Sequence, residues 1–79
     1  MKKLLITGGT GSFGNAVLER FVQSNQFEEI RIFSRDEKKQ DDMRHRLKNS
    51  KVKFYIGDVR DIASLHYAME NVDYIFHAA

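Results

Sequence analysis

Short apolar runs of strand length alternate along the chain with longer stretches whose apolar residues recur at helical spacing. The apolar runs lie at residues 3–7, 29–33, 52–56 and 74–77. Continuous apolar runs of this length are typical of strands that are covered on both faces of a sheet. A parallel sheet with crossover connections requires such strands to alternate with helices, so the pattern predicts an α/β fold with the element order β-α-β-α-β-α-β.

The stretches between these runs predict three helices. Residues 12–24 carry one apolar stripe, which consists of Phe13, Val17, Leu18, Phe21 and Val22. Residues 36–48 are helical in pattern but polar, with Met43 and Leu47 as the apolar pair, so we expect this helix to lie exposed on the surface. Asp61 stands where the N-cap of the third helix is expected. The expected buried stripe of that helix is Ile62, Leu65, Ala68 and Met69.

Right-handed crossovers and the usual order of a doubly wound sheet predict four parallel strands in the order 3-2-1-4, the first part of a Rossmann fold. Two helices would then cover one face of the sheet and the third helix the other. This arrangement leaves apolar surface and the outer edge of the fourth strand bare, and natural chains cover such surfaces. We therefore expect residues 1–79 to be the N-terminal part of an incomplete domain that continues past Ala79.

Composition narrows the function classes further. The chain has no cysteine, and its histidines (His45, His66 and His77) lack a metal-ligand spacing, so we expect no metal site and a reducing, cytoplasmic compartment. The apolar run before Thr7 is too short for a signal peptide or a membrane span. The net charge is +2. The basic stretch from Arg35 to Lys53 mixes both signs without interleaved aromatics, so a solvated helix face is expected there rather than a nucleic-acid site.

A glycine-rich segment follows the first strand and opens the first helix. It fits both G-x-G-x-x-G (Gly9, Gly11, Gly14) and G-x-x-G-x-x-G (Gly8, Gly11, Gly14). Such a segment gives a tight turn, a bare backbone that a pyrophosphate can approach, and close packing of helix on strand. The helix N-terminus adds free N–H groups and partial positive charge. The segment therefore predicts a dinucleotide site; the alternative is a glycine-rich turn without a ligand.

The end of the second strand predicts which dinucleotide binds. An acid at this position binds the ribose hydroxyls of NAD, whereas an arginine accommodates the 2′-phosphate of NADP. If Phe33 ends the strand, Ser34 fills the acidic position with Arg35 beside it, which favours NADP. In the competing interpretation Asp36 reaches the ribose and the cofactor is NAD. Asp58, at the end of the third strand, is expected beside the adenine or is a simple turn residue.

Five segments together resemble the extended short-chain dehydrogenase/reductase family over all 79 residues: Ile6–Gly14, Phe33–Glu37, Tyr55–Asp61, Val72–Tyr74 and His77–Ala79. They are most similar to the bacterial polysaccharide-biosynthesis enzymes that act on UDP-N-acetylglucosamine, the 4,6-dehydratases and the related 4-epimerases. The resemblance implies that NADP is the cofactor. The residues that it and the glycine motif assign to cofactor binding are Gly8, Thr10, Gly11, Ser12, Phe13, Gly14, Ser34, Arg35, Lys39, Asp58, Val59 and Ala78.

The resemblance also implies a reaction. The cofactor takes a hydride from C4 of the UDP-sugar, and the hydride returns either to C6 after loss of water or to C4 on the opposite face. Family members use a downstream hydroxyl residue and a lysine, often as Tyr-x-x-x-Lys or Met-x-x-x-Lys. Here Tyr67 is followed four positions on by Asn71, so we expect no catalytic residue within this chain and no activity from residues 1–79 alone.

His77, at the end of the fourth strand, is a possible acid or base, but we expect it to hydrogen-bond locally. In the full-length enzyme we expect a homo-oligomer. The mixed charges of the basic stretch and the short apolar runs lead us to expect neither a nucleic-acid nor a membrane partner. A noncatalytic module that senses NADP is the alternative, because this fold can bind without turnover.

Overall fold

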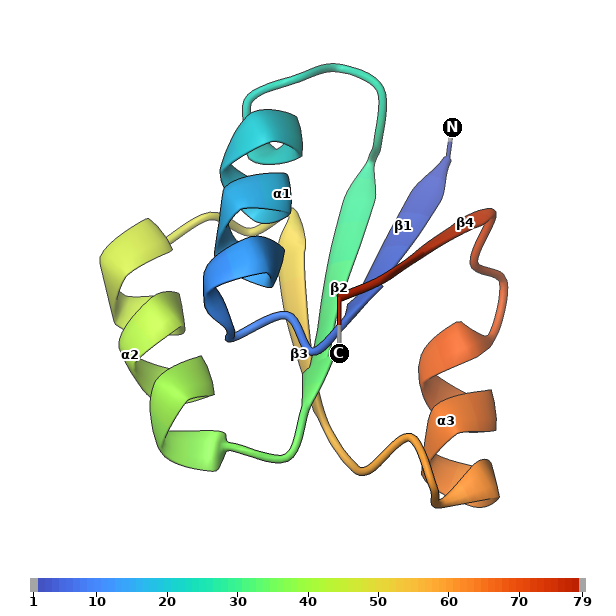
Figure 1. The fold of residues 1–79 in the computed structure, drawn as a ribbon. Helices are drawn as coiled ribbons and strands as arrows, with labels where there is room; N and C mark the ends of the chain where they lie inside the picture. The colour runs from blue at the N-terminus through green and yellow to red at the C-terminus, as the bar shows by residue number, and fades with distance from the viewer. Residues whose placement is uncertain (1, 79) are drawn as a thin grey trace.

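The structure is a computed structural model that describes residues 2–78. Its elements are β1 (Lys3–Thr7), α1 (Ser12–Val22), β2 (Glu29–Ser34), α2 (Glu37–Leu47), β3 (Val52–Ile56), α3 (Ile62–Met69) and β4 (Tyr74–His77). The four strands pair in parallel in the order β3-β2-β1-β4 (Figure 1). The predicted strand order and the Rossmann-like α/β fold are confirmed, with β2 ending one residue later than expected.

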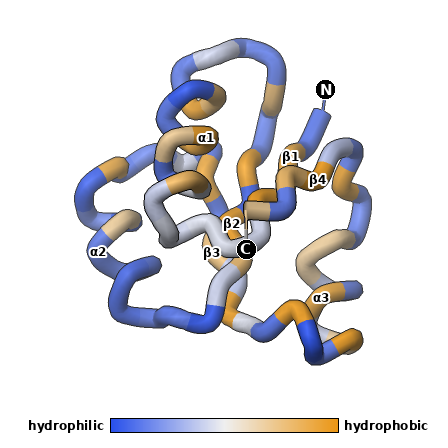
Figure 2. Tube along the Cα trace, viewed as in Figure 1, coloured by the Kyte–Doolittle hydropathy of each residue, from blue (hydrophilic) through white to orange (hydrophobic). Residues whose placement is uncertain are grey.

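Helices cover both faces of the sheet, with α1 and α2 on one side and α3 on the other (Figure 1). Successive side chains of a strand point to opposite faces, so Leu4 and Ile6 of β1 join one core whereas Leu5 joins the other. The larger core lies under α1 and α2 and consists of Leu4, Ile6, Val17, Leu18, Val22, Phe27, Ile30, Ile32, Met43 and Val52. The smaller core, under α3, consists of Leu5, Phe33 and Ala68. Figure 2 shows the apolar strands at the centre and the largely hydrophilic α2 outside them.

The three helices begin in different ways. Asp36 caps α2 by accepting a hydrogen bond from the Lys39 N–H at 3.0 Å, and Asp61 caps α3 by accepting from the Ala63 N–H at 3.2 Å. The expected N-cap of α3 is therefore confirmed. The N-cap of α1 is Gly11, which has no side chain to offer, so no side chain caps the N–H groups of its first turn. An uncapped helix N-terminus can bind an anion.

Three expectations about the helices need correction. Helix α2 is not exposed throughout, because its residues Gln40 and Met43 face the sheet and are only 1% and 3% exposed. Phe13 was expected in the buried stripe of α1, yet it is 60% exposed, and its ring forms a T-shaped pair with that of Phe76, with ring centroids 5.3 Å apart. Ile62 was expected in the buried stripe of α3 but is 62% exposed. Phe13 and Ile62 lie in the first turn of their helices, whereas the helix residues buried in the two cores, Val17, Leu18 and Ala68 among them, lie in later turns.

Strand β1 lies at the centre of the sheet, between β2 and β4. Lys3 stands beside Glu29 in the β1–β2 register, and Thr7 stands beside His77 in the β1–β4 register. The start of β4 is fixed by the Lys3 N–H, which donates to the Asp73 carboxylate at 2.8 Å. The strand order reverses at β1, because the connection after β1 runs through α1 on one face of the sheet and the connection into β4 runs through α3 on the other (Figure 1). Ligands bind at such switch points.

Candidate functional site

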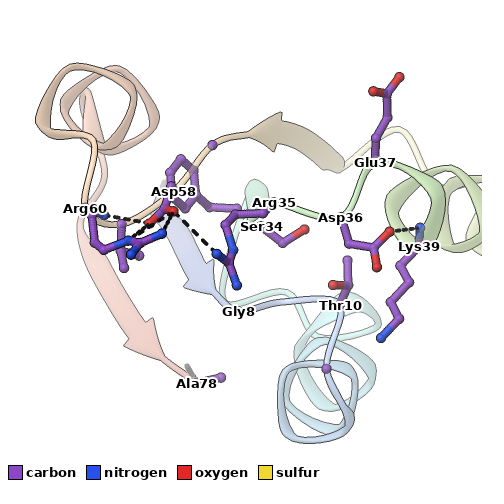
Figure 3. Close-up of a pocket in the computed structure, with 14 residues that line it drawn as sticks. Gly8, Thr10, Ser34, Arg35, Asp36, Glu37, Lys39, Asp58, Arg60 and Ala78 are labelled. Atoms are coloured by element: carbon purple, nitrogen blue, oxygen red, sulfur yellow. Dashed lines mark hydrogen bonds and ion pairs between the residues drawn. The ribbon is translucent and has the colours of Figure 1, made fainter.

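A groove of about 980 Å³ lies at the carboxyl ends of the strands. It is lined by Gly8, Thr10, Gly11, Phe33, Ser34, Arg35, Asp36, Glu37, Lys39, Gly57, Asp58, Val59, Arg60 and Ala78 (Figure 3). The loops after β1, β2 and β3 supply most of the lining, and Ala78 directly after β4 adds to it. The groove therefore lies at the topological switch point, where doubly wound sheets bind their ligands.

Most of the residues predicted to bind a cofactor line this groove. Those that do are Gly8, Thr10, Gly11, Ser34, Arg35, Lys39, Asp58, Val59 and Ala78. Ser12, Phe13 and Gly14 do not line it; they form the first turn of α1 behind the glycine loop. Sequence reasoning missed Phe33, Glu37, Gly57 and Arg60, and it considered Asp36 only as the alternative ribose ligand. The signal for Arg60 was its place two residues after Asp58, in the same turn.

The glycine loop has distinct steric demands at each position. Gly8 adopts φ 66° and donates its N–H to the Phe33 carbonyl at 2.9 Å, which turns the chain sharply out of β1. A Cβ on Gly14 would lie 2.6 Å from the Cα of Gly9, so only glycine lets α1 approach the loop this closely. A Cβ on Gly11 would meet only the Gly8 carbonyl oxygen, at 3.5 Å. Gly11 thus presents bare backbone to the groove, as a pyrophosphate site requires.

Asp58 is the centre of an ion-pair cluster in the groove (Figure 3). Its carboxylate accepts hydrogen bonds from Arg60, from Nη2 at 2.8 Å and from Nε at 3.2 Å, and the Arg60 backbone N–H donates at 2.9 Å. The Arg35 guanidinium lies 3.6 Å away on the other side. The hydrogen bonds from Arg60, with the charges of Arg60 and Arg35 as smaller contributions, hold the pKa of Asp58 well below its usual range. Asp58 is therefore ionised and largely neutralised by Arg60 at neutral pH.

The segment after β2 carries the remaining charges of the groove. The carboxylate of Asp36 is engaged in capping α2, and Figure 3 shows the Glu37 side chain pointing away from the Asp58 cluster. The side chain of Arg35 is 72% exposed, so it is free to move toward a ligand. Three cations line the groove: Arg35, Lys39 and Arg60. The Arg60 guanidinium is hydrogen-bonded to the Asp58 carboxylate, whereas no carboxylate of the described residues is hydrogen-bonded to the side chain of Arg35 or Lys39.

Ser34 is the last residue of β2 and is 8% exposed. Its hydroxyl oxygen accepts a hydrogen bond at 2.9 Å from the side-chain amide of Gln40 on α2. The extension of β2 by one residue thus places Ser34 at the strand terminus, where dinucleotide folds meet the adenosine ribose.

Two residues with possible catalytic chemistry have local partners instead. The Nδ1 of His77 hydrogen-bonds to the Thr7 hydroxyl on the neighbouring strand. A hydrogen bond near the strand end was expected from the sequence, but Thr7 was not predicted as its partner. Tyr67 is exposed on α3, and its ring centroid lies 5.5 Å from that of Tyr55. Among residues 2–78 no cluster of three or more His, Asp or Glu side chains could hold a metal ion. No helix within that range is long and apolar enough to cross a bilayer.

Known proteins resemble this chain over nearly all of its length. UDP-glucose 4-epimerase of Rickettsia prowazekii (strain Madrid E) is 69% identical over 81 aligned positions, which cover 99% of this chain and 24% of the relative. UDP-glucose 4-epimerase of Rickettsia canadensis (strain McKiel) is 68% identical with the same coverage. The chain therefore spans about a quarter of the length of these relatives.

Solved structures share the fold of this chain. The protein Pen from Bacillus thuringiensis superimposes with a TM-score of 0.91 at 37% identity, covering 99% of this chain and 24% of that one. PbgP3 from Burkholderia pseudomallei, at 22% identity over 96% of this chain and 22% of that one, shares the fold with a TM-score of 0.76. The sequence profile of a family described as polysaccharide biosynthesis protein matches residues 4–79. With almost the whole chain inside that profile, the chain belongs to the polysaccharide biosynthesis protein family.

Proposed function

We propose that this chain is the NADP-binding part of a nucleotide-sugar enzyme, a 4,6-dehydratase or 4-epimerase that acts on UDP-N-acetylglucosamine or a closely related UDP-hexose. The observation that carries the proposal is the groove itself, which joins an uncapped helix N-terminus to an exposed arginine directly after β2. The names of the Rickettsia relatives, UDP-glucose 4-epimerase, support the epimerase form and a UDP-linked hexose.

The groove fits a dinucleotide at each of its parts. Gly11 leaves open space in front of the α1 N-terminus, where a pyrophosphate would accept hydrogen bonds from backbone N–H groups. Thr10 and Ala78 would flank it, and Asp58 with Val59 would lie beside the adenine. When bound there, a nicotinamide cofactor supplies reversible hydride transfer, while the protein supplies orientation and electrostatics.

The charges of the groove favour NADP over NAD. A 2′-phosphate needs donors and positive charge, and the donors at the end of β2 are Ser34, Arg35 and Lys39. An NAD site instead needs a free carboxylate at this position. Asp36 is the only candidate in that segment that the sequence suggested, and its carboxylate is engaged in capping α2. This supports the arginine interpretation.

The remaining parts of the proposal concern the whole protein. We propose a cytoplasmic homo-oligomer in bacterial surface polysaccharide biosynthesis, with the catalytic hydroxyl residue and lysine outside residues 1–79. A noncatalytic NADP-sensing module is the alternative. A turnover assay with UDP-glucose and UDP-N-acetylglucosamine separates the enzyme from the sensor, because a sensor converts neither. Mass spectrometry of the product identifies a dehydratase, whose product is lighter than its substrate by one water. A 4-epimerase product has the same mass as its substrate but a changed C4–H coupling in the NMR spectrum.

The cofactor part of the proposal is tested by titrating the full-length protein with NADP⁺ and NAD⁺ at fixed ionic strength, because salt screens the phosphate interaction. One charge-assisted hydrogen bond contributes about 1.5–3 kcal/mol, so NADP⁺ should bind roughly 10- to 100-fold more tightly. The double variant Ser34→Asp, Arg35→Ala should reverse this order.

Lys38→Ala is the matched control, because Lys38 is a neighbouring cation that is 86% exposed and pairs with Asp42 outside the groove. It should leave the cofactor preference unchanged. Equal affinity of the wild-type protein for both cofactors would contradict the roles of Ser34 and Arg35 and favour Asp36 as the ribose ligand.

A further inference from the structure

Gln40 is a polar residue of α2 whose side chain is buried between the helix and the sheet. The pattern of apolar residues in the sequence does not explain why a glutamine is buried there. It is 1% exposed, and its Nε2 donates to the Tyr55 carbonyl oxygen and to the Ser34 hydroxyl oxygen, both at 2.9 Å. The Ser34 carbonyl oxygen lies 3.4 Å from the same nitrogen. The other end of the amide, Oε1, is buried with no partner among the described residues. A buried polar atom without a partner needs an explanation in terms of what the arrangement achieves.

The neighbouring carbonyl oxygens fix which way this amide points. If the amide were flipped, Oε1 would face the carbonyl oxygens of Tyr55 and Ser34, and acceptor would face acceptor. The orientation with Nε2 toward the strands is therefore the one that the site permits. Its two hydrogens go to the two closest acceptors, the Tyr55 carbonyl and the Ser34 hydroxyl.

This orientation determines the role of the Ser34 hydroxyl. A serine hydroxyl has one hydrogen to donate and lone pairs that accept. Because the Ser34 oxygen accepts from Gln40, the hydroxyl hydrogen must point away from the Gln40 amide. Ser34 lines the groove beside Arg35 (Figure 3), so the hydrogen is available to an acceptor that binds there.

We propose that Gln40 is a positioning residue for cofactor choice: it holds the Ser34 hydroxyl as a hydrogen-bond donor toward the 2′-phosphate of NADP, without touching the cofactor itself. The inference rests on the proposed function, because it presupposes that NADP binds in the groove. It assigns a part in that function to Gln40, a buried residue of α2 that does not line the groove and contacts Ser34 from the protein interior. The hydroxyl of NAD at the same position can donate as well as accept, so NAD binding depends little on the direction of the Ser34 hydrogen.

The test is a double-mutant cycle on the full-length protein, with Ser34→Ala, Gln40→Met and the double variant, titrated with NADP⁺ and with NAD⁺. Ser34→Ala should lower the ratio of NADP⁺ to NAD⁺ affinity about 10-fold, as expected for one hydrogen bond to a charged group. Gln40→Met should lower it by several-fold. The double variant should match Ser34→Ala, since Gln40 acts through Ser34.

Two further variants guard against a merely structural effect. Gln40→Glu places a carboxylate beside the Ser34 hydroxyl, which attracts the hydroxyl hydrogen inward, so the NADP⁺ preference should again fall. Met43→Ala removes a side chain buried on the same helix that has no hydrogen bond to Ser34. It should weaken folding but leave the ratio of affinities unchanged. NAD⁺ affinity reports in every variant whether the groove is still folded.

The possible outcomes separate this inference from the proposed function. A wild-type protein without NADP⁺ preference overturns the proposed cofactor and this inference together. A wild-type preference that persists in Gln40→Met and Gln40→Glu overturns the inference alone. Effects of Ser34→Ala and Gln40→Met that add in the double variant, or a parallel loss of both cofactors in both Gln40 variants, also overturn it, because Gln40 would then be structural only.

Discussion

Replacement of Gly14 by alanine should destabilise the protein, although helix propensity alone predicts the opposite. Gly14 lies in the first turn of α1, and alanine is favoured over glycine within a helix by up to about 1 kcal/mol. The added Cβ, however, would lie 2.6 Å from the Gly9 Cα and 2.7 Å from the Gly8 carbonyl oxygen. Carbon atoms in contact are about 3.5–4.0 Å apart, so α1 would have to move away from the loop by roughly 1 Å.

Overpacking of this kind costs about 1–3 kcal/mol, and occasionally more. After the gain in helix propensity of up to about 1 kcal/mol is subtracted, the free energy of unfolding should fall by up to about 2 kcal/mol. The assay is urea denaturation of wild-type and Gly14→Ala protein, followed by circular dichroism. Gly11→Ala is the matched control, because its Cβ would lie 3.5 Å from the nearest atom outside its chain neighbours and should cost less. A Gly14→Ala variant at least as stable as wild type would refute the close packing of α1 on the glycine loop.

Three further predictions concern the groove and the sheet. Gly11→Val should abolish dinucleotide binding, measured by calorimetry, while the protein stays folded, because the side chain would fill the space of the pyrophosphate; wild-type affinity would make the loop purely structural. Asp58→Asn should be less stable than wild type at about pH 6, and the urea midpoints of the two proteins should converge as the pH falls below about 4. The reason is that the folded protein lowers the pKa of Asp58, so the carboxylate stabilises the fold above the pKa of an unfolded aspartate and loses this effect as it is protonated in acid. A difference in midpoint that does not change with pH would contradict the ion pair with Arg60. Residues 1–79 alone should bind a hydrophobic dye, since Tyr74 and Ile75 are about half exposed, and should convert no UDP-sugar; measurable turnover would show that the catalytic residues are misplaced.

The strands and their order could be predicted from the sequence because each strand is a short apolar run and the crossover rule leaves few arrangements. The strand at residues 52–56 was predicted with the observed bounds, and so was the capping by Asp61. The burial of Gln40 on α2 could not be predicted, since Gln40 is polar and its Nε2 donates to Ser34 and Tyr55, which lie on two strands that the fold brings together. Apolar periodicity contains no information on such a polar contact.

The candidate site shows the same division. The glycine loop and the segment at the end of β2 were predicted to bind a cofactor, and most of those residues line one groove. Arg60 was missed because its role comes from a hydrogen-bonded pair with Asp58 that depends on the turn geometry. Phe13 was assigned to the site by resemblance, yet it lies outside the groove with its ring against Phe76, a contact that requires β4 to lie next to β1.

The central place of β1 has a consequence for the order in which the protein assembles. Lys3 has Glu29 beside it on one strand, whereas 70 residues separate it from Asp73, which anchors the strand on its other side. The entropy of closing the longer loop costs about 0.9 kcal/mol more, and the residues of β4 leave the ribosome after those of β1, β2 and β3. We therefore expect β1, β2 and β3 to form a sheet first, with one side of β1 left open until β4 joins it. Ala78, whose N–H donates to the Thr7 carbonyl, arrives with β4, so this part of the groove lining forms only after β1, β2 and β3 have paired.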